Sequence, residues 1–419
     1  MSLKNQEILK IPKLAMIVLG IYRNNFTESI ALRRIYLIYS LIVHVFVFIF
    51  MTSMTFWVAM VLAEKDRSEE LTEKLISNLA YLASIYVALI KVIFYETKSL
   101  QQMITTVENK EKEIQQSQEQ EQLETYAAQA RFCTKYNLFA LATHIFIYGF
   151  AMYGNIATRI KIGRWNKLYN KTMEKPLIYE VYYPKMDPIR HETFIMLFSN
   201  LGVTIMIWLS FSTCMLLGFI VFVPSTAKAL QNALRNMSHL KADLSALKVA
   251  AVQHQQFVRF VTDMNDSVKY LLLMEYITVS FNVALTAFTV LKEKSFLLQL
   301  GILLYSGSIV AYVLILGWSC SEIKFQSMEI ASAVYESPWY QHSKEAKSIL
   351  FIIMVRAQRP LIVTKGPFGE MSLESSVAVT YTNISRLVSM QKVNVLSIRV
   401  IKEVLILSDC EAHKPRPQS

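Results

Sequence analysis

The run IYLIYSLIVHVFVFIFMTSMTFWVAMVLA, residues 35–63, contains no Asp, Glu, Lys or Arg. A helix needs about 20 apolar residues to cross the roughly 30 Å hydrocarbon core of a bilayer. The run begins too late in the chain for a secretory signal peptide, and no small-residue cleavage site follows a short apolar core. The sequence therefore predicts a membrane-spanning helix here.

Five further apolar runs are long enough to span a bilayer. Two of them contain one charged residue each, Lys91 in the first and Glu275 in the fourth. The last two are joined by the short KEKS segment, which predicts an antiparallel pair of helices. The five runs are 75–95, 136–158, 194–223, 270–291 and 296–320.

The composition agrees with a membrane protein. Hydrophobic residues make up 53% of the 419 residues and charged residues only 18%, which is too little charge to cover a soluble protein of this size. The net charge of +11 favours contact with anionic lipid headgroups. The basic residues form no stripe along the sequence, so nucleic acid is not an expected partner.

The segments between the runs differ in character. Residues 96–131 are rich in Gln and Glu, with apolar residues at helical spacing, which predicts an amphipathic helix outside the membrane. Residues 224–269 show the same period and predict helices that project into water and pack on each other. Residues 159–193 lack an apolar stripe and predict a long loop, in which Asn170 begins an Asn-x-Thr glycosylation sequon.

The pattern changes after residue 320. The stretch SILFIIMV, residues 348–355, is too short to span a bilayer and predicts a buried helix outside it. Pro360 and the Gly366-Pro367 pair then interrupt the chain. Residues 371–391 are long enough for a helix but hold many hydroxyl and amide side chains, which predicts either a helix that lines a pore or a peripheral helix in water.

The sequence contains no motif of a catalytic or metal site. It has no phosphate-binding Gly-rich loop with Lys, no nucleophile elbow and no paired metal ligands, so we expect neither an enzyme nor a cofactor. The four cysteines form no Cys-x-x-Cys pair, and we expect no disulfide. They are Cys133, Cys214, Cys320 and Cys410.

Three linked motifs in the last third of the chain resemble the insect odorant receptors. They are SEIKFQSMEIASAVYESPWYQHS at 321–343, IIMVRAQRPLIVTKGPFGEMSLES at 352–376 and SRLVSMQ at 385–391. Within them, the Tyr-x-x-Pro-Trp-Tyr turn, the Gln-x-Pro-Leu motif, the Gly-x-Phe and the Ser-Leu-Glu helix start follow the order and spacing of that family. The first 320 residues resemble the family only in layout.

The resemblance implies an all-α membrane protein with seven transmembrane helices and a cytoplasmic helical anchor domain, acting as one subunit of a tetrameric channel. The implied division is a cytoplasmic N-terminus at 1–34, six transmembrane helices within 35–320 with an extracellular loop at 159–193, a cytoplasmic anchor segment at 321–370, a pore-lining seventh helix at 371–391 and an extracellular tail at 392–419. The distribution of Lys and Arg favours a cytoplasmic N-terminus only mildly.

The resemblance also implies a function. The chain would be the odorant-binding subunit of a ligand-gated, non-selective cation channel, assembled with the odorant-receptor co-receptor in the plasma membrane of olfactory sensory neurons. The co-receptor carries a longer loop between helices 4 and 5 than residues 224–269 allow, which favours the ligand-binding subunit. A small volatile odorant would bind between helices 2, 3, 4 and 6, in the outer half of the membrane.

Candidate residues follow from the same resemblance. The ligand-binding candidates are Tyr81, Leu82, Phe146, Gly149, Phe150, Tyr153, Phe198, Leu201, Leu304, Tyr305 and Ser308. The anchor candidates are Tyr335, Pro338, Trp339 and Tyr340, and the pore and gate candidates are Val388, Lys392, Ser385 and Thr380. Trp and Tyr suit a subunit contact because they supply large contact areas with few rotors.

The sequence departs from the family pattern at two places. Lys392 stands where relatives carry an apolar gate residue, and 28 residues follow Gln391 where relatives end sooner. A gustatory-receptor-type channel remains the nearest alternative in architecture. A G-protein-coupled receptor is disfavoured because 159–193 holds no Cys and no Asn-Pro-x-x-Tyr motif is present.

Overall fold

The computed structural model of the chain describes residues 7–21, 29–65, 68–116, 120–170, 175, 180–182, 188–236, 244–292, 296–382 and 385. Within these residues the fold is almost entirely helical, and the one β contact is an isolated bridge between Thr364 and Glu370. The helices are α1 (Lys10–Leu19), α2 (Ile30–Ala63), α3 (Glu69–Tyr95), α4 (Lys98–Gln116), α5 (Gln120–Tyr169), α6 (Pro188–Arg235), α7 (Leu244–Lys292), α8 (Phe296–Glu336), the short 3-10 helix η3 (Trp339–Gln341) and α9 (Lys344–Ala357).

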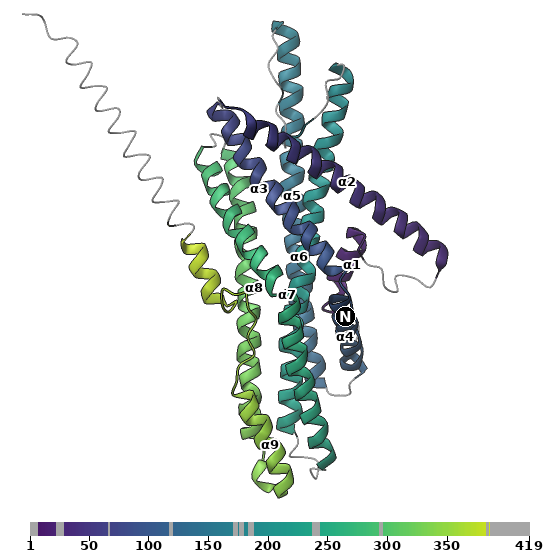
Figure 1. The fold of residues 1–419 in the computed structure, drawn as a ribbon, viewed down its shortest axis with the longest axis vertical. Helices are drawn as coiled ribbons and strands as arrows, with labels where there is room; N and C mark the ends of the chain where they lie inside the picture. Colours follow the sequence, from purple (N-terminus) through teal and green to yellow (C-terminus); the bar gives the residue numbers. More distant parts are fainter. Residues whose placement is uncertain are drawn as a thin grey trace, which may run out of the picture.

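Six of these helices, α2, α3, α5, α6, α7 and α8, are long and apolar enough to cross a membrane. The four longest run along the long axis of the molecule, while α2 crosses them obliquely near one end and α9 lies at the other end (Figure 1). Helices α5, α6 and α7 have 50, 48 and 49 residues. At 1.5 Å per residue each is roughly 70–75 Å long, more than twice the hydrocarbon thickness. These helices therefore continue well outside the bilayer.

Helix α6 is the centre of the bundle. It packs against α5, α8 and α1 and makes smaller contacts with α2, α3 and α7. In α6, 78% of the apolar window that could span a membrane is buried by protein, whereas in α5 only 11% is buried. The apolar residues of α6 therefore form a protein core, and most of those of α5 face outward, where lipid covers them.

Helix α1 packs against α6 at a glycine. A Cβ added to Gly218 would lie 2.9 Å from Cγ of Pro12, so only glycine allows this approach without a shift. Helix α1 ends at Gly20, which adopts a left-handed conformation with φ 77°, and the Ile21 N–H donates to the carbonyl of Met16 at 3.0 Å. The sequence prediction treated residues 1–34 as a cytoplasmic segment without elements, and it missed both α1 and the start of α2.

Polar side chains set the start of two other helices. Ser68 caps α3 by accepting from the N–H of Leu71 at 3.2 Å, and Ser343 caps α9 by accepting from the N–H of Ala346 at 3.3 Å. Such caps satisfy N–H groups that have no partner inside the helix. Pro360 lies three residues beyond the end of α9 and prevents its continuation.

Helices lie in both segments for which the sequence predicts extramembrane helices, but their boundaries differ over 96–131. Leu100, Met103, Ile104 and Val107, which the sequence placed on one face, are buried in α4. The predicted single helix over 96–131 is wrong. Helix α3 ends at Tyr95, α4 ends at Gln116, and residues 120–131 belong to α5.

The predicted loop at 159–193 is too long. Helix α5 continues to Tyr169, and α6 already begins at Pro188. Asn170, the sequon residue, follows α5 directly with φ 48° and is exposed. Asparagine tolerates this left-handed conformation better than most residues, which suits it to a helix end.

Helix α9 also differs from its prediction. Ala346, Leu350, Ile353 and Ala357 are buried, but Phe351 and Ile352 are 60% and 65% exposed. The stretch SILFIIMV is thus half buried within this subunit, because its apolar residues extend around the helix and only one face meets α7 and α8.

The segment after α9 returns along α8 and leads into a last helix. The N–H of Met371 donates to the carbonyl of Val363 at 2.8 Å, which closes a turn that contains Gly366 and Gly369, both with positive φ. Residues 373–382 are then helical. This helix begins with a reciprocal cap, in which Ser372 and Ser375 each accept from the backbone N–H of the other at 3.2 and 3.1 Å.

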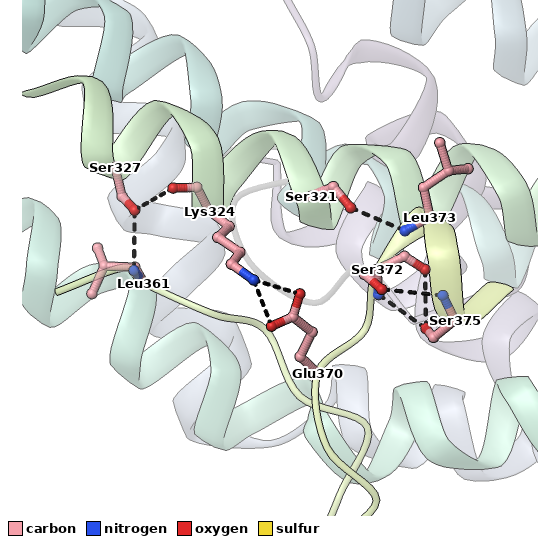
Figure 2. A network of polar contacts seen from close by, with 8 residues as sticks. All are labelled: Ser321, Lys324, Ser327, Leu361, Glu370, Ser372, Leu373 and Ser375. Carbon is pink, nitrogen blue, oxygen red and sulfur yellow. Dashed lines mark hydrogen bonds and ion pairs between the residues drawn. The ribbon is translucent and has the colours of Figure 1, made fainter. Parts of the chain in front are cut away.

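Polar contacts fix this segment on α8, as Figure 2 shows. Lys324 donates to both carboxylate oxygens of Glu370 at 2.9 Å. Ser321 accepts from the N–H of Leu373 at 3.0 Å, and Ser327 accepts from the N–H of Leu361 at 3.0 Å. Because the three α8 residues lie three positions apart, they form one polar stripe along the helix. The start of the last helix is therefore held in register with α8.

Candidate functional site

A cavity of about 120 Å³ lies between α3, α5, α6, α7 and α8. Most of its surface is apolar and aromatic, and a few polar side chains converge on it. A small, mostly apolar cavity with convergent polar groups is the usual form of a small-molecule site. The residues that line it are Ser84, Val87, Ala88 and Lys91 of α3; Tyr136, Asn137, Ala140, His144 and Tyr148 of α5; Thr213 and Cys214 of α6; Glu275, Thr278, Val279 and Asn282 of α7; and Tyr305, Ser308, Ile309 and Tyr312 of α8.

An ion pair forms part of the cavity wall. Nζ of Lys91 lies 2.5 Å from Oε2 of Glu275, and the two side chains are only 4% and 7% exposed. A lone charge at this depth would be very costly, so each residue requires the other. Replacing such a pair by apolar residues is often neutral for stability, so stability alone does not account for two charges in a membrane-spanning bundle.

A second polar contact crosses the same two helices. Nδ2 of Asn282 donates to Oγ of Ser84 at 3.0 Å. Ser84 and Asn282 each lie seven positions from the member of the ion pair on their own helix, so the two contacts are separated by about 10 Å along antiparallel helices. The cavity therefore has two levels, one at the ion pair and one at Ser84.

Three rings gather at the Ser84 level. The ring of His144 stacks near Tyr148 with centroids 6.1 Å apart, and the ring of Tyr305 meets both of them edge-on at 6.3 and 6.2 Å. Nδ1 of His144 lies 2.6 Å from the carbonyl oxygen of Ala140, which can only accept, so Nδ1 donates. In the neutral ring, Nε2 then carries a lone pair. We call these three residues the aromatic cluster.

The structure brings only some of the predicted ligand residues to this cavity. Tyr305 and Ser308 line it. Tyr81, Leu82, Phe198 and Leu201 pack instead in the adjoining core, where the Tyr81 hydroxyl donates to the carbonyl of Gly202 at 3.0 Å and Phe50 lies between the rings of Tyr81 and Phe198.

The predicted residues of α5 lie on the opposite side of that helix. Phe146 and Tyr153 are 66% and 71% exposed, Phe150 is exposed, and a Cβ added to Gly149 would meet nothing within 4 Å. Residues two positions apart on a helix point about 200° apart, so Phe146 cannot share a face with His144. Leu304 likewise is exposed beside Tyr305. The spans were predicted well, but the rotation of α5 about its axis was not.

The residues that the sequence prediction missed carry a clear signal. Lys91 and Glu275 are single charges of opposite sign inside apolar runs, and such residues are functional candidates by default. His144, an ionisable residue in the apolar run 136–158, is a functional candidate for the same reason. The pairing could have been proposed from the sequence, because each charge would otherwise be buried alone.

The anchor candidates lie at the far end of α8. Tyr335 is 70% exposed, and Trp339 and Tyr340 of η3 are exposed, while Pro338 is half buried. Within this chain η3 packs on α8 and α9. The turn thus presents its aromatic rings outward instead of burying them in its own subunit.

The pore candidates are described only in part. The hydroxyl of Thr380 donates to the carbonyl of Ser376 at 2.9 Å, and that of Ser385 donates to the carbonyl of Thr382 at 3.1 Å. These hydroxyls are satisfied within their own helix, so they do not by themselves require contact with water. Val388 and Lys392 lie outside the described residues.

Comparison with known families and sequences adds a further finding. Residues 71–382 match the family described as 7tm Odorant receptor. The chain is 27% identical over 175 residues to Odorant receptor 10 of Aedes albopictus, covering 38% of this chain and 46% of that protein. It is 31% identical over 130 residues to Odorant receptor Or2 of Anopheles gambiae, covering 30% and 34%. The aligned segments thus span less than half the length of these two relatives.

The fold is similar to a solved structure over nearly its whole length. The insect olfactory receptor OR5 from Machilis hrabei superposes with a TM-score of 0.70, covering 92% of this chain and 97% of that one at 15% sequence identity. At this level of identity the similarity shows a shared fold.

Proposed function

The chain belongs to the 7tm Odorant receptor family, a family of multi-pass membrane proteins, and on that premise we propose that it is the odorant-binding subunit of a heteromeric, ligand-gated cation channel. The observation that carries the proposal is the cavity of about 120 Å³ between α3, α5, α6, α7 and α8. Its size and its largely apolar surface suit a small volatile molecule, which offers few polar groups and binds mainly through apolar contact.

The ligand site in this proposal consists of the aromatic cluster, Ser308 and the cavity-lining side chains at the level of the Lys91–Glu275 ion pair. Tyr305 and Ser308 are common to this set and to the residues predicted from the sequence. Tyr81, Leu82, Phe198 and Leu201 would support the site from the adjoining core. We give Phe146, Gly149, Phe150, Tyr153 and Leu304 no contact with ligand, because they face away from the cavity.

We assign the partner contact to the exposed aromatic end of the molecule. Tyr335, Trp339 and Tyr340, with Phe351 and Ile352 of α9, are exposed large apolar side chains close to one another in sequence and fold. Exposed apolar patches of this kind mark protein–protein contacts. The partners would be subunits of the odorant-receptor co-receptor, in a complex with four subunits.

The conduction path in this proposal is formed by the helix that starts at residue 373. Thr380 and Ser385 would lie along it, and Val388 would form an apolar constriction that excludes water in the resting state. Val388→Ser should therefore raise the resting current or change ion permeability, whereas Val377→Ser, eleven residues earlier on the described part of the helix, should leave the resting current unchanged. Equal resting currents in wild type and Val388→Ser would contradict the placement of the gate.

The proposed location is the plasma membrane of olfactory sensory neurons, with a cytoplasmic N-terminus. In this orientation the α5–α6 connection is outside, and the long ends of α6, α7 and α8 are cytoplasmic. Accessibility of tags at Asn170 and near Glu336 on intact cells tests the orientation.

The decisive experiment is an odorant panel applied to cells that express this chain with and without the co-receptor. We expect odorant-evoked cation currents only when both subunits are present. Robust currents from this chain alone would overturn the requirement for a partner. An absence of any ligand-evoked current in the pair, with both subunits at the cell surface, would overturn the proposed function.

A further inference from the structure

The cavity is unusual in having an ion pair at one level and aromatic rings at the other. Glu275 and Lys91 lie on α7 and α3, seven positions from the Asn282–Ser84 contact that marks the level of the aromatic cluster. On α8, Tyr305 belongs to the aromatic cluster, while Tyr312 lies seven positions further, at the ion-pair level. We call Lys91, Glu275 and Tyr312 the polar floor.

The polar floor retains unused hydrogen-bonding capacity. The hydroxyl of Tyr312 is buried, and among the side chains that the structure describes it has no hydrogen-bond partner. Lys91 and Glu275 pair with each other, but a carboxylate has about four acceptor sites and an ammonium three donors, so a single ion pair does not saturate either group. A buried hydroxyl without a partner is costly, so a ligand that supplies one gains binding energy here.

The charge balance of the floor limits the kind of ligand. Lys91 and Glu275 neutralise each other, so a charged ligand would leave one charge uncompensated in a low-dielectric site. A pure hydrocarbon would cover the floor and leave its polar groups without a partner. A neutral hydroxyl group both donates and accepts, so it can donate to the carboxylate of Glu275 and accept from a neighbouring donor.

The cavity volume limits the size of the ligand. A dry cavity of about 150 Å³ in another protein binds benzene. The present volume of about 120 Å³ therefore suits a body no larger than one six-membered ring or a short alkyl chain.

We propose that the polar floor selects a small, neutral, hydroxyl-bearing ligand, an alcohol or a phenol, over hydrocarbons of the same shape. The hydroxyl lies at Lys91, Glu275 and Tyr312, and the apolar body lies against the aromatic cluster. This proposal rests on the proposed function, because it takes the cavity as the ligand site.

Binding of phenol and toluene to the full chain purified in detergent tests the proposal directly. The two probes have the same number of non-hydrogen atoms and differ in the hydroxyl alone. Ligand-induced thermal stabilisation, read at several concentrations, gives the two affinities without any need for channel current. We expect phenol to bind at least about tenfold more tightly than toluene, as one buried hydrogen bond requires.

Two variants identify the groups responsible. The double variant Lys91→Met with Glu275→Met removes both charges together, so that neither is left buried alone, and it should bind toluene at least as well as phenol. Tyr312→Phe should weaken phenol a few-fold and leave toluene unchanged. Glu70→Gln is the matched control, because it removes an exposed ion pair from the same helix α3, with Lys74, and should keep the wild-type preference.

The outcomes separate this proposal from the proposed function. Equal binding of phenol and toluene, or tighter binding of benzylammonium or benzoate than of phenol, would overturn the selection and leave the cavity as a ligand site. An unchanged preference in the Lys91→Met, Glu275→Met variant would overturn the role of the floor. Binding of neither probe would overturn the inference as well, while the odorant-panel currents would show independently whether the proposed function stands.

Discussion

Glu111 joins the first helix of the chain to the bundle. This buried residue of α4 accepts hydrogen bonds at Oε1 from the N–H groups of Ile8 and Leu9, at 3.0 and 3.3 Å, and from the hydroxyl of Tyr126 at 2.7 Å. The two N–H groups immediately precede α1 and have no partner within it, so a carboxylate from another helix serves as the N-terminal cap. Burial raises the pKa of Glu111, and the hydrogen bond from Tyr126 and the charge of Lys13, 4.0 Å away, offset this only in part.

This arrangement makes the acceptor oxygen more important than the charge. Glu111→Gln should keep α1 docked, because an amide oxygen can accept the same bonds. Glu111→Ala should release it, at a cost of about 1–3 kcal/mol for the donors left unsatisfied. Hydrogen exchange of residues 10–21 measures the difference, with Glu113→Ala on the same helix as the control. Equal loss of protection in the Gln and Ala variants would contradict the capping role.

Glu192 forms two ion pairs near the end of α5 and the start of α6. It accepts from Arg159 at 2.6 Å and also pairs with Lys175. Burial raises its pKa, but the hydrogen bonds from Lys175 and Arg159 outweigh burial, and the pKa of Glu192 lies below its ordinary value. A lowered acid pKa stabilises the fold above the unfolded pKa of about 4.3, and this contribution is lost as the pH falls through the folded value.

Acidification should therefore reduce the advantage of wild type over a variant without this charge. At pH 7 the thermal midpoint of Glu192→Gln is expected to lie below that of wild type, and the gap should be smaller near pH 3, below the unfolded pKa of about 4.3. Thermal unfolding of the purified chain at both pH values gives the double difference. A gap of the same size at pH 7 and pH 3 would assign the effect of the substitution to shape and not to charge.

Helix α7 connects the cavity to the start of the last helix through two adjacent residues. Glu275 is in the cavity wall, and the hydroxyl of Tyr276 donates to the carbonyl of Ser375 at 2.6 Å. Nζ of Lys365 lies 4.4 Å from the centre of the same tyrosine ring. Gly317 lets the last helix, which starts at residue 373, approach α8 closely, because a Cβ added to Gly317 would lie 2.3 Å from Oγ of Ser376. A ligand that shifts Glu275 would therefore also shift the next residue, Tyr276, whose hydroxyl is bonded to the start of the last helix.

Tyr276→Phe should weaken this connection and leave ligand binding intact. The variant keeps the ring beneath Lys365 and loses one hydrogen bond, worth about 0.5–1.5 kcal/mol. We expect a roughly two- to tenfold change in the ligand concentration for half-maximal current, with unchanged affinity in the thermal binding assay. Tyr270→Phe, an exposed position on the same helix, is the control. A parallel loss of affinity would place Tyr276 in the binding site instead.

Helices in the membrane were largely predictable because a bilayer constrains them by length and polarity. All six predicted spans lie inside helices of the structure. Helix α1 was not predicted, since ten residues with Lys10 and Lys13 give little signal until α4 and α6 are there to bury them. The rotation of α5 was not predictable either, because an apolar residue such as Phe146 satisfies lipid and protein equally well.

At the scale of the whole molecule, two of the exposed apolar surfaces have different causes. Along α2 and α5 the apolar surface lies on helices that cross the membrane, where lipid covers it. At the end of α8 and on α9 it lies on helices that extend well beyond the spans, next to Lys344 and Glu345. In the proposed complex, another subunit covers these side chains.

Trp339→Ala should lower assembly more than it lowers the stability of the single chain. Truncating a tryptophan at the centre of a protein contact typically costs about 2 kcal/mol or more of binding free energy. Within its own chain the Trp339 ring buries only part of its surface, so its loss should cost the isolated chain less. The yield of complex with the co-receptor, measured by size-exclusion chromatography, is expected to fall while the thermal midpoint of the isolated chain changes little. Phe139→Ala on α5 is the control. A normal yield of complex with a shifted dose response would instead connect the turn to ligand binding.

The candidate site was less predictable than the fold for a related reason. Hydropathy shows which residues belong to a membrane-spanning helix. Which of those residues meet in a cavity depends on the rotation and tilt of five helices. Tyr305 and Ser308 were found because the family pattern placed them, and Lys91 with Glu275 were passed over although their charges were visible in the sequence. Opposite charges in separate spans are the better guide, since only pairing makes them tolerable.

The place of α1 beneath α6 has a consequence for biosynthesis. About two hundred residues separate Pro12 from Gly218, so the ribosome needs roughly 10–40 s after releasing the first helix before its binding surface exists. During that interval the face of α1 that packs on α6 has no α6 to cover it, although α4 and α5 are already made. Helix α1 is therefore made well before α6 and docks on it late, and substitutions in residues 8–21 should impair the closing of the finished bundle and spare the insertion of α2.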